Sequence, residues 1–442
     1  MDKPDSQLWF AEALLPDGWV SDVALTISDG RIAAIDTGVE AAGERHAVAL
    51  PGMPNLHSHA FQRAMAGLTE QKTAGQDSFW TWRELMYRYL ERLTPDDVEA
   101  IAALAYMEML EGGFTRVGEF HYLHHDASGV AYSDPAEMAG RIVKAAETTG
   151  IGLTLLPVFY AHSGFGGQAP TQGQRRFIND LDSFADVWHG ARRHAERLPD
   201  AVMGAAPHSL RAVTPQELDA VAMLSDGPVH IHIAEQEKEV ADCVAWSGAR
   251  PVEWLLDNAE VDDGWCLVHA THMTAAETQA LVRSGAVAGL CPITEANLGD
   301  GVFPAQAFVE QRGRFGIGSD SNVLIDAAQE LRLLEYGQRY ILKSRNVIDE
   351  LYGRAVRGGA QALGVPEGLV VGGAADIVSL DAGHAALFGK SGNARLDAHV
   401  FAAAGDIDCV WRHGRKVVEG GRHIRREAVV AEYRKIVERL KA

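Results

Sequence analysis

The sequence predicts an α/β protein: a TIM-like (β/α)8 barrel with a small β-sandwich domain built from both ends of the chain. Short apolar runs alternate with longer helical patterns through the middle of the chain. Polar side chains, above all histidines, directly follow several of these runs, as at the carboxyl ends of barrel strands. The 442 residues exceed the roughly 250 of a bare barrel and leave chain at both ends for a second unit.

The two ends of the chain resemble each other in pattern. Residues 1–50 and 370–442 alternate short apolar runs with Gly and Asp-Gly turns, of which Asp29-Gly30 is one. We expect these two segments to form the composite β-sandwich domain, with a helix at the C-terminal end. Residues 51–369 are expected to form the barrel.

Eight strand-like runs occur in order between these ends. Their expected cores are residues 48–57, 114–120, 151–160, 201–208, 228–233, 264–269, 285–291 and 314–320. The stretches between them are long enough for crossover helices. Residues 95–110, for example, have apolar positions at helical spacing and two acids, Asp96 and Asp97, in the first turn. The whole pattern is typical of parallel strands connected by helices.

The first run ends in His57-Ser58-His59. On an extended chain, residues two apart point the same way, so both imidazoles are directed at one point. Two neutral imidazoles suit a cation such as zinc. Taken alone, a His-x-His pair is equally consistent with ordinary surface or core histidines.

Three further polar positions make the metal interpretation stronger. His232 ends the fifth run and is followed three residues later by Glu235, His269 ends the sixth, and Asp320 ends the eighth. Because the carboxyl ends of parallel barrel strands converge on one face, these side chains are expected to lie together with His57 and His59.

Composition excludes several classes of function. The chain is 47% hydrophobic and 23% charged, and we find no apolar stretch long enough to span a bilayer and no export signal at its start. A net charge of -20 argues against nucleic acid or an anionic membrane as a partner. The four cysteines show no close-pair spacing, which favours reduced thiols. We expect a cytoplasmic enzyme, a homodimer, that acts on a small molecule.

The pattern of polar residues at strand ends resembles the amidohydrolase superfamily. Four longer motifs resemble, more narrowly, the N-formimidoylglutamate deiminases of bacterial histidine degradation: residues 52–67, 79–88, 294–301 and 334–339. The resemblance covers nearly the whole chain. It implies hydrolytic deimination of N-formimidoyl-L-glutamate to N-formyl-L-glutamate and ammonia.

The resemblance also implies a metal centre. We expect one divalent ion per chain, Zn²⁺, held by His57, His59, His232 and Asp320, with a position left open for water. Two-metal members of the superfamily bridge their ions with a modified lysine at the end of the fourth strand, and residues 205–211 contain no lysine. Three histidines after the second strand are expected in a solvated loop and not as ligands: His121, His124 and His125.

The chemistry assigns roles to the other polar residues. Glu235 is expected to carry a proton from the attacking water to the departing nitrogen, while His269 and Asp320 hold and deprotonate that water. Glu235 and His269 can exchange the role of base. Each residue also has a purely structural alternative. Glu235 could be an acid in the first turn of a helix, favoured there by the helix dipole, and His269 could be a histidine of the core.

The substrate carries two carboxylates, which guanidinium groups bind well. Matching family positions imply that the substrate is bound by Gln62, Arg83, Tyr122, His208 and Arg211. Arg83 could instead stack on aromatic neighbours or pair with Glu84 or Glu91. Gln62 and Tyr122 could simply line the wall of the site.

One position departs from the family pattern, because Asn322 stands where a histidine is usual. Asp320 itself is present, so the class of chemistry is unaffected. The sequence leaves two other functions as alternatives. One is a related aminohydrolase acting on a purine or triazine ring, which would need an aromatic slot and fewer arginines. The other is a metal-free scaffold of the same fold, which the complete set of four ligands with Glu235 disfavours.

Overall fold

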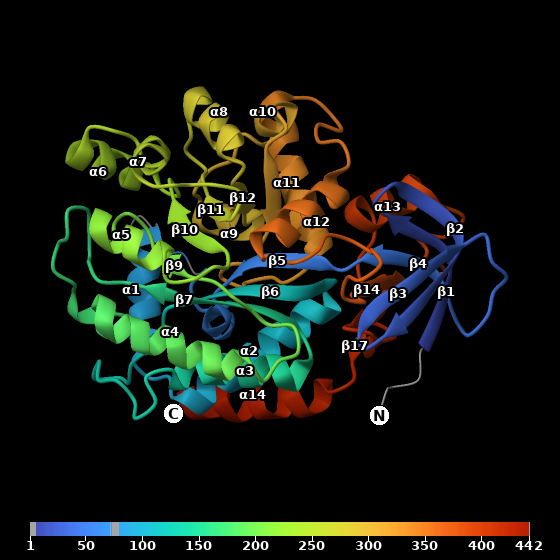
Figure 1. Ribbon diagram of the computed structural model, residues 1–442, viewed down its shortest axis with the longest axis horizontal. Helices are drawn as coiled ribbons and strands as arrows, with labels where there is room; N and C mark the ends of the chain where they lie inside the picture. Colours follow the sequence, from blue (N-terminus) through green and yellow to red (C-terminus); the bar gives the residue numbers. More distant parts are fainter. Residues whose placement is uncertain (1–5, 71, 73–78, 442) are drawn as a thin grey trace.

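The computed structural model describes residues 6–70, 72 and 79–441, arranged as a parallel barrel with a second sheet beside it (Figure 1). The barrel strands are β5 (Met53–Ser58), β6 (Phe114–His121), β7 (Gly152–Phe159), β8 (Val202–Met203), β9 (Ala206–Pro207), β10 (Val229–Ile233), β11 (Trp265–His269), β12 (Val287–Leu290) and β13 (Arg314–Ile317). Neighbouring strands pair in parallel in the order β10-β11-β12-β13-β5-β6-β7-β8, and β9 also pairs with β7. A parallel bridge between Ala205 and Val229 closes the ring. The predicted fold class is confirmed.

Helices surround the barrel and connect successive strands. They are η1 (Ala60–Met65), α1 (Phe79–Leu90), α2 (Pro95–Glu111), α3 (Glu137–Thr149), η2 (Gln172–Gln174), α4 (Leu181–Ala195), α5 (Pro215–Ala222), α6 (Glu237–Ser247), α7 (Pro251–Asn258), α8 (Ala275–Ser284), α9 (Pro292–Leu298), α10 (Ala305–Glu310), α11 (Ala327–Leu342) and α12 (Leu351–Ala362). Helix α2 matches the predicted helix. It begins at a capping box between Thr94 and Asp97, with Pro95 in the first turn, and ends at Gly112.

The second sheet contains strands from both ends of the chain. They are β1 (Ser6–Leu15), β2 (Gly18–Ser28), β3 (Arg31–Thr37), β4 (Glu44–Pro51), β14 (Ile377–Leu380), β15 (Ile407–Arg412), β16 (Arg415–Glu419) and β17 (Arg422–His423). β4 joins the two halves, since it pairs with β1 on one side and β14 on the other.

This sheet folds over on itself. Phe10 of β1 and Trp411 of β15 are three strand spacings apart along the sheet, which would separate them by about 14 Å if the sheet were flat. Their ring centroids are 6.0 Å apart. The two halves therefore enclose a small apolar core between them, as in a sandwich.

Two strand boundaries differ from the predicted ones. The predicted run over residues 48–57 belongs to two strands, because β4 ends in the small sheet at Pro51 and β5 starts the barrel at Met53. The predicted fourth strand is broken into β8 and β9. The domain boundaries themselves stay a prediction. The remaining helices are α13 (Gly392–Phe401) and α14 (Arg426–Lys441), and α14 packs on α2 of the barrel (Figure 1).

The barrel interior is filled at the level just below the histidines. Leu56 is fully buried, and it occupies space that two neighbouring strands leave open by carrying glycine. A Cβ atom at Gly316 would lie 2.5 Å from Leu56 Cδ2, and one at Gly289 would lie 2.9 Å from Leu56 Cδ1. These two glycines let Leu56 close the barrel beneath His57, so the polar site lies only at the carboxyl ends of the strands. None of the helices in the described ranges has both the length and the apolar character needed to cross a bilayer.

Candidate active site

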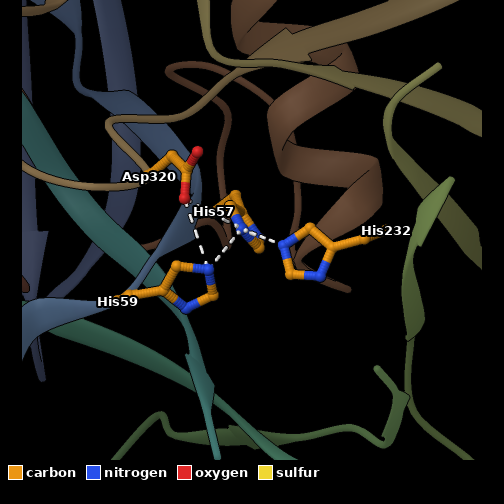
Figure 2. Close-up of side chains that lie close together, drawn as sticks. All are labelled: His57, His59, His232 and Asp320. Atoms are coloured by element: carbon orange, nitrogen blue, oxygen red, sulfur yellow. Dashed lines mark hydrogen bonds and ion pairs between the residues drawn. The ribbon is translucent and has the colours of Figure 1, made fainter. Parts of the chain in front are cut away.

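Three histidines and one aspartate converge at the carboxyl end of the barrel (Figure 2). The Nε2 atom of His57 lies 3.2 Å from that of His59 and 3.0 Å from that of His232. The Oδ1 atom of Asp320 lies 3.5 Å from His57 Nε2 and 3.3 Å from His59 Nε2. All four candidate ligand atoms lie within 4.8 Å of one another. The structure therefore brings together the four residues that the sequence predicts as metal ligands.

The hydrogen bonds on the far side of the imidazoles fit a cation at this point. His59 Nδ1 lies 2.9 Å from the carbonyl oxygen of Phe120, and His232 Nδ1 lies 3.1 Å from that of His208. A carbonyl only accepts, so each Nδ1 carries the proton and each Nε2 presents a lone pair. His57 Nε2 faces the lone pairs of both His59 Nε2 and His232 Nε2. A single proton on His57 Nε2 can be donated to only one of these two nitrogens. A cation would satisfy all three nitrogens and the Asp320 carboxylate.

Burial keeps these imidazoles neutral. It lowers the pKa of His57 to about 3 and lowers the pKa of His59 as well, and it holds the pKa of His232 well below its usual value. Neutral imidazole is the form that binds a metal ion. The donor set is therefore ready for a cation at neutral pH.

The backbone fixes Asp320 against the first barrel strand. The Asp320 amide donates to the carbonyl oxygen of His57 at 2.9 Å, and the His59 amide donates to the carbonyl oxygen of Asp320 at 2.9 Å. Asp320 has φ +43° and His269 has φ +68°, both in the left-handed region that non-glycine residues rarely adopt. Such conformations persist where the surrounding structure enforces them, commonly at functional sites.

Asn322, the departure from the family pattern, is fully bonded beneath the site. Its side-chain amide donates to Ser58 Oγ at 3.1 Å and to the carbonyl oxygen of Asp320 at 3.0 Å, and its Oδ1 accepts from Ser319 Oγ at 2.6 Å. Asn322 thus links Ser58, which lies between the first two histidines, to the backbone of Asp320.

Glu235 and His269 lie beside this cluster. His269 Nε2 is 3.9 Å from Glu235 Oε1 and 3.8 Å from Asp320 Oδ2. Burial raises the pKa of Glu235, while the charge of Glu235 and the contact with Glu295 raise the pKa of His269 against the effect of burial. A carboxyl that titrates close to neutral pH beside a partly desolvated imidazole suits proton transfer.

The sequence prediction missed Glu295 as a residue of this site. Its Oε1 lies 3.2 Å from His269 Nδ1. Glu295 belongs to one of the motifs that carry the family resemblance, but an acid in the first turn of a helix is explained equally well by the helix dipole. The missing signal was spatial, since α9 and β11 are separate in sequence.

A cavity of about 50 Å³ opens directly over the cluster. Of the predicted site residues, only His57 is absent from its lining. The cavity is lined by His59, Gln62, Phe79, Trp82, Arg83, Met86, Tyr122, His208, Arg211, His232, Glu235, His269, Thr294, Leu298 and Asp320. A larger hollow of about 930 Å³ lies between the small sheet and helices α11 to α13, and it contains none of the predicted site residues. Chemistry, not size, therefore identifies the smaller cavity as the candidate site.

Two arginines line this cavity with hydrogen-bonding capacity to spare. The Arg83 guanidinium lies over the rings of Trp80, at 4.7 Å, and Tyr87, at 5.7 Å, as the stacking alternative predicted. Arg211 is buried, with 6% of its surface exposed. The Nε atoms of both are buried without a hydrogen-bond partner among the described residues. Both are therefore available to an anionic ligand.

The other predicted substrate residues also line this cavity. Gln62 Nε2 donates to the hydroxyl of Tyr122 at 2.9 Å, and the Tyr122 hydroxyl donates to Met86 Sδ at 3.2 Å. His208 Nδ1 lies 3.0 Å from Ser209 Oγ. Gln62 Oε1 is buried without a partner in the described part of the chain, so it can accept a hydrogen bond from a ligand.

The prediction that His121, His124 and His125 lie in a solvated loop is wrong. The loop was expected to be solvated, but all three side chains are buried, and His121 is the last residue of β6. His124 and His125 bond to backbone carbonyl oxygens, of Val158 and Ile178. None of the three belongs to a potential metal-ligand group among the described residues.

Comparisons with known proteins agree with this geometry. The model of the amidohydrolase family matches residues 48–417, and that of the N-terminal domain of formimidoylglutamate deiminase HutF matches residues 8–47. A formimidoylglutamate deiminase from Pseudomonas aeruginosa is 54% identical over 432 residues, covering 94% of this chain and 95% of that protein. A 5-methylthioadenosine/S-adenosylhomocysteine deaminase from Natronomonas pharaonis is 27% identical over 86% of this chain and 85% of its own length.

Solved structures give the same result for the fold. The crystal structure of an amidohydrolase from Brucella melitensis matches with a TM-score of 0.96 and 53% sequence identity. The match covers 99% of this chain and 100% of that chain. An adenosine deaminase from Xanthomonas campestris, at 24% identity, shares the fold with a TM-score of 0.84 over 99% of this chain and 98% of its own. From its sequence, its barrel and its long match to a curated relative, the chain belongs to the amidohydrolase family and, within it, to the formimidoylglutamate deiminases.

Proposed function

We propose that this protein hydrolyses N-formimidoyl-L-glutamate to N-formyl-L-glutamate and ammonia, a step of histidine degradation. The observation that carries the proposal is the composition of one cavity. Its lining includes Glu235, residues of the candidate metal-ligand group, and two arginines whose Nε atoms have no hydrogen-bond partner in the described part of the chain. The P. aeruginosa relative, at 54% identity, has the same activity in its name.

We propose that His57, His59, His232 and Asp320 hold one divalent ion, Zn²⁺. Three imidazole nitrogens and a carboxylate suit zinc, and the fourth strand offers no lysine to bridge a second ion. When bound by these four residues, such an ion would lower the pKa of a water molecule to near neutral, which is the chemistry that the hydrolysis needs.

The chain's own residues manage the protons. Glu235 takes one proton from the attacking water and delivers it to the imino nitrogen as the C–O bond forms. The second proton of that water then passes to the same nitrogen, and the C–N bond breaks as the C=O bond of the formyl group forms, so the nitrogen leaves as ammonia. The raised pKa of Glu235 suits a group that must both accept and donate. His269 and Asp320 orient the water, since His269 Nε2 lies 3.8 Å from Asp320 Oδ2 beside the cavity.

The remaining residues bind and orient the substrate. Arg211 and Arg83 are proposed to hold the two carboxylates of the glutamate part, because guanidinium groups form paired hydrogen bonds with carboxylates. Gln62 and Tyr122 contact the same part of the substrate, and His208 lies beside the formimino group. This assignment is supported by the place of all five in the cavity lining.

Ammonia release from a panel of compounds tests the function. The panel contains formimidoyl derivatives of glutamate, aspartate and glycine together with aminopurines, and Glu235→Gln is the inactive control. We expect formimidoylglutamate to have the highest kcat/KM. Turnover of aminopurines alone would favour the ring deaminase, and no turnover with metal bound would favour a scaffold. Cytoplasmic location and the homodimer stay predictions, which cell fractionation and light scattering test.

A further inference from the structure

We propose that Glu295 is a positioning residue, which holds the ring of His269 with Nδ1 protonated and Nε2 directed toward the cavity between Glu235 and Asp320. The inference rests on the catalytic role proposed above for His269. It assigns a function to the motif of residues 294–301, which the proposed mechanism otherwise leaves without a role.

The contact between the two side chains is direct and buried. Glu295 Oε1 lies 3.2 Å from His269 Nδ1, and Glu295 and His269 are 4% and 1% exposed. A carboxylate oxygen only accepts hydrogen bonds, so Nδ1 must carry the proton in this contact. The carboxylate–imidazole pair therefore determines which ring nitrogen faces the cavity.

Glu295 is itself held firmly. Its Oε1 accepts a second hydrogen bond from the backbone amide of Cys291 at 2.9 Å. Its own amide donates to the carbonyl oxygen of Cys291 at 2.9 Å, and its carbonyl accepts from the amide of Asp300 at 2.9 Å. The amide of Gly299 also donates to the Glu295 carbonyl. Glu295 is thus fixed in the first turn of α9 by four bonds besides the one to His269, as a residue must be if it is to orient another.

His269 needs such an orienting partner. It is the last residue of β11 and has φ +68°, and Ala270 after it has φ +47°. The alternation of a regular strand therefore does not set the direction of this side chain. Its other nitrogen, Nε2, lies 3.9 Å from Glu235 Oε1 and 3.8 Å from Asp320 Oδ2. A modest rotation of the ring would move Nε2 away from both groups.

The same residues could be read as a second metal site, since His269, Cys291 and Glu295 have ligand atoms within 4.8 Å of one another. Two observations favour the hydrogen-bonded pair. Burial, together with the charges of Asp320 and Glu295, raises the pKa of the Cys291 thiol, which keeps it protonated. Glu295 Oε1 is also already engaged by the Cys291 amide.

A double-mutant cycle tests the proposal with the metal-loaded full chain. The variants are Glu295→Gln, His269→Asn and the two combined, with Glu295→Asp as the conservative change and Glu310→Gln, an exposed acid on α10, as the matched control. Metal content and the unfolding midpoint are measured for each. We expect Glu295→Gln to lower kcat about 10- to 100-fold with KM within about twofold and metal content unchanged. Glu295→Asp should recover part of the loss, and Glu310→Gln should match wild type.

The decisive comparison is made in the His269→Asn background. If Glu295 acts through His269, adding Glu295→Gln there should change kcat by less than about twofold. An equal loss in both backgrounds would overturn the proposal, because a general structural effect does not depend on His269. Loss of one ion per chain in Glu295→Gln would support the second metal site instead. Normal turnover by His269→Asn would reject the proposed role of His269, and Glu295 would then have no catalytic group to position.

Discussion

Arg412 of β15 donates a hydrogen bond to the carboxylate of Asp200, so a buried ion pair joins the small sheet to the barrel. Asp200 also accepts from Arg116 of β6, and Arg412 Nη1 donates to Asp376 Oδ1 at 3.1 Å. The side chains of Arg412 and Arg116 are 2% and 5% exposed. Asp200 thus balances two guanidinium groups that water hardly reaches.

Asp200→Asn should destabilise the protein by about 3–5 kcal/mol, because it leaves the buried guanidinium of Arg116 without its charged partner and that of Arg412 with Asp376 alone. Denaturant unfolding at pH 7 measures the loss. Glu427→Gln is the matched control, since it breaks a pair with Arg422 whose side chains are 65% and 88% exposed, and such surface pairs contribute about 0–1 kcal/mol. Equal stability of the two variants would mean that this ion pair does not stabilise the fold.

The same pair predicts a dependence of stability on pH. Burial would raise the pKa of Asp200, but the charges of Arg412 and Arg116 outweigh it, and the pKa is lowered from 3.8. A carboxyl whose pKa is lowered in the folded state stabilises the protein at pH values above its pKa in the unfolded state. This contribution is lost as the pH falls through the pKa of the folded state. The stability difference between wild type and Asp200→Asn should therefore shrink between pH 5 and pH 2, as denaturant unfolding at several pH values would show. A difference that grows in acid would contradict it.

Residues at strand ends made most of the site predictable from sequence. Parallel strands carry their last side chains to one face, so His57, His232, His269 and Asp320 could be assigned to one site from position alone. Arg83 illustrates the opposite case. Its sequence context was consistent with both stacking and substrate binding. In the structure it stacks on Trp80, and its Nε has no hydrogen-bond partner among the described residues.

Other features depend on contacts that the sequence does not display. The apolar run at residues 48–57 is continuous, yet it passes from one sheet to the other at Gly52, where a Cβ atom would lie 2.2 Å from Thr115 Oγ1. His121 has both ring nitrogens buried without a partner among the described residues, so polarity alone wrongly suggested an exposed loop. Glu295 was missed because its partner, His269, lies on another strand.

Elemental analysis of the purified protein should find about one divalent ion per active chain. The reason is the donor set: His57, His59, His232 and Asp320 supply one group of ligands, and residues 205–211 at the fourth strand contain no lysine to bridge two ions. Removal of the ion by a chelator should abolish turnover, and Zn²⁺ should restore it. Two tightly bound ions per active chain would contradict the single-ion centre.

Glu235→Gln should retain nearly normal metal content but lower turnover by about a hundredfold or more. Glutamine has the size of glutamate but cannot carry a proton, and Glu235 is not among the four residues proposed to hold the metal ion. Steady-state kinetics with elemental analysis checks the change, and Glu237→Gln, two residues away in the first turn of α6, is the control. Wild-type turnover by Glu235→Gln would assign proton transfer to another residue.

Arg211→Met tests the identity of the substrate through its charge. The chain carries a net charge of -20, so a substrate with two carboxylates is attracted only if the pocket itself is positive. Loss of one guanidinium–carboxylate contact in a partly desolvated site should cost about 2–5 kcal/mol of transition-state binding, a fall in kcat/KM of about 30-fold or more.

Arg88→Met, at an exposed arginine of α1, should leave kcat/KM unchanged. Zinc should stay bound in both variants, and a neutral diamide of the substrate should be turned over equally by wild type and Arg211→Met. If Arg211→Met hydrolyses formimidoylglutamate as well as wild type does, Arg211 does not bind the carboxylate. If aminopurines are the better substrates of both, the ring-deaminase function replaces the deiminase.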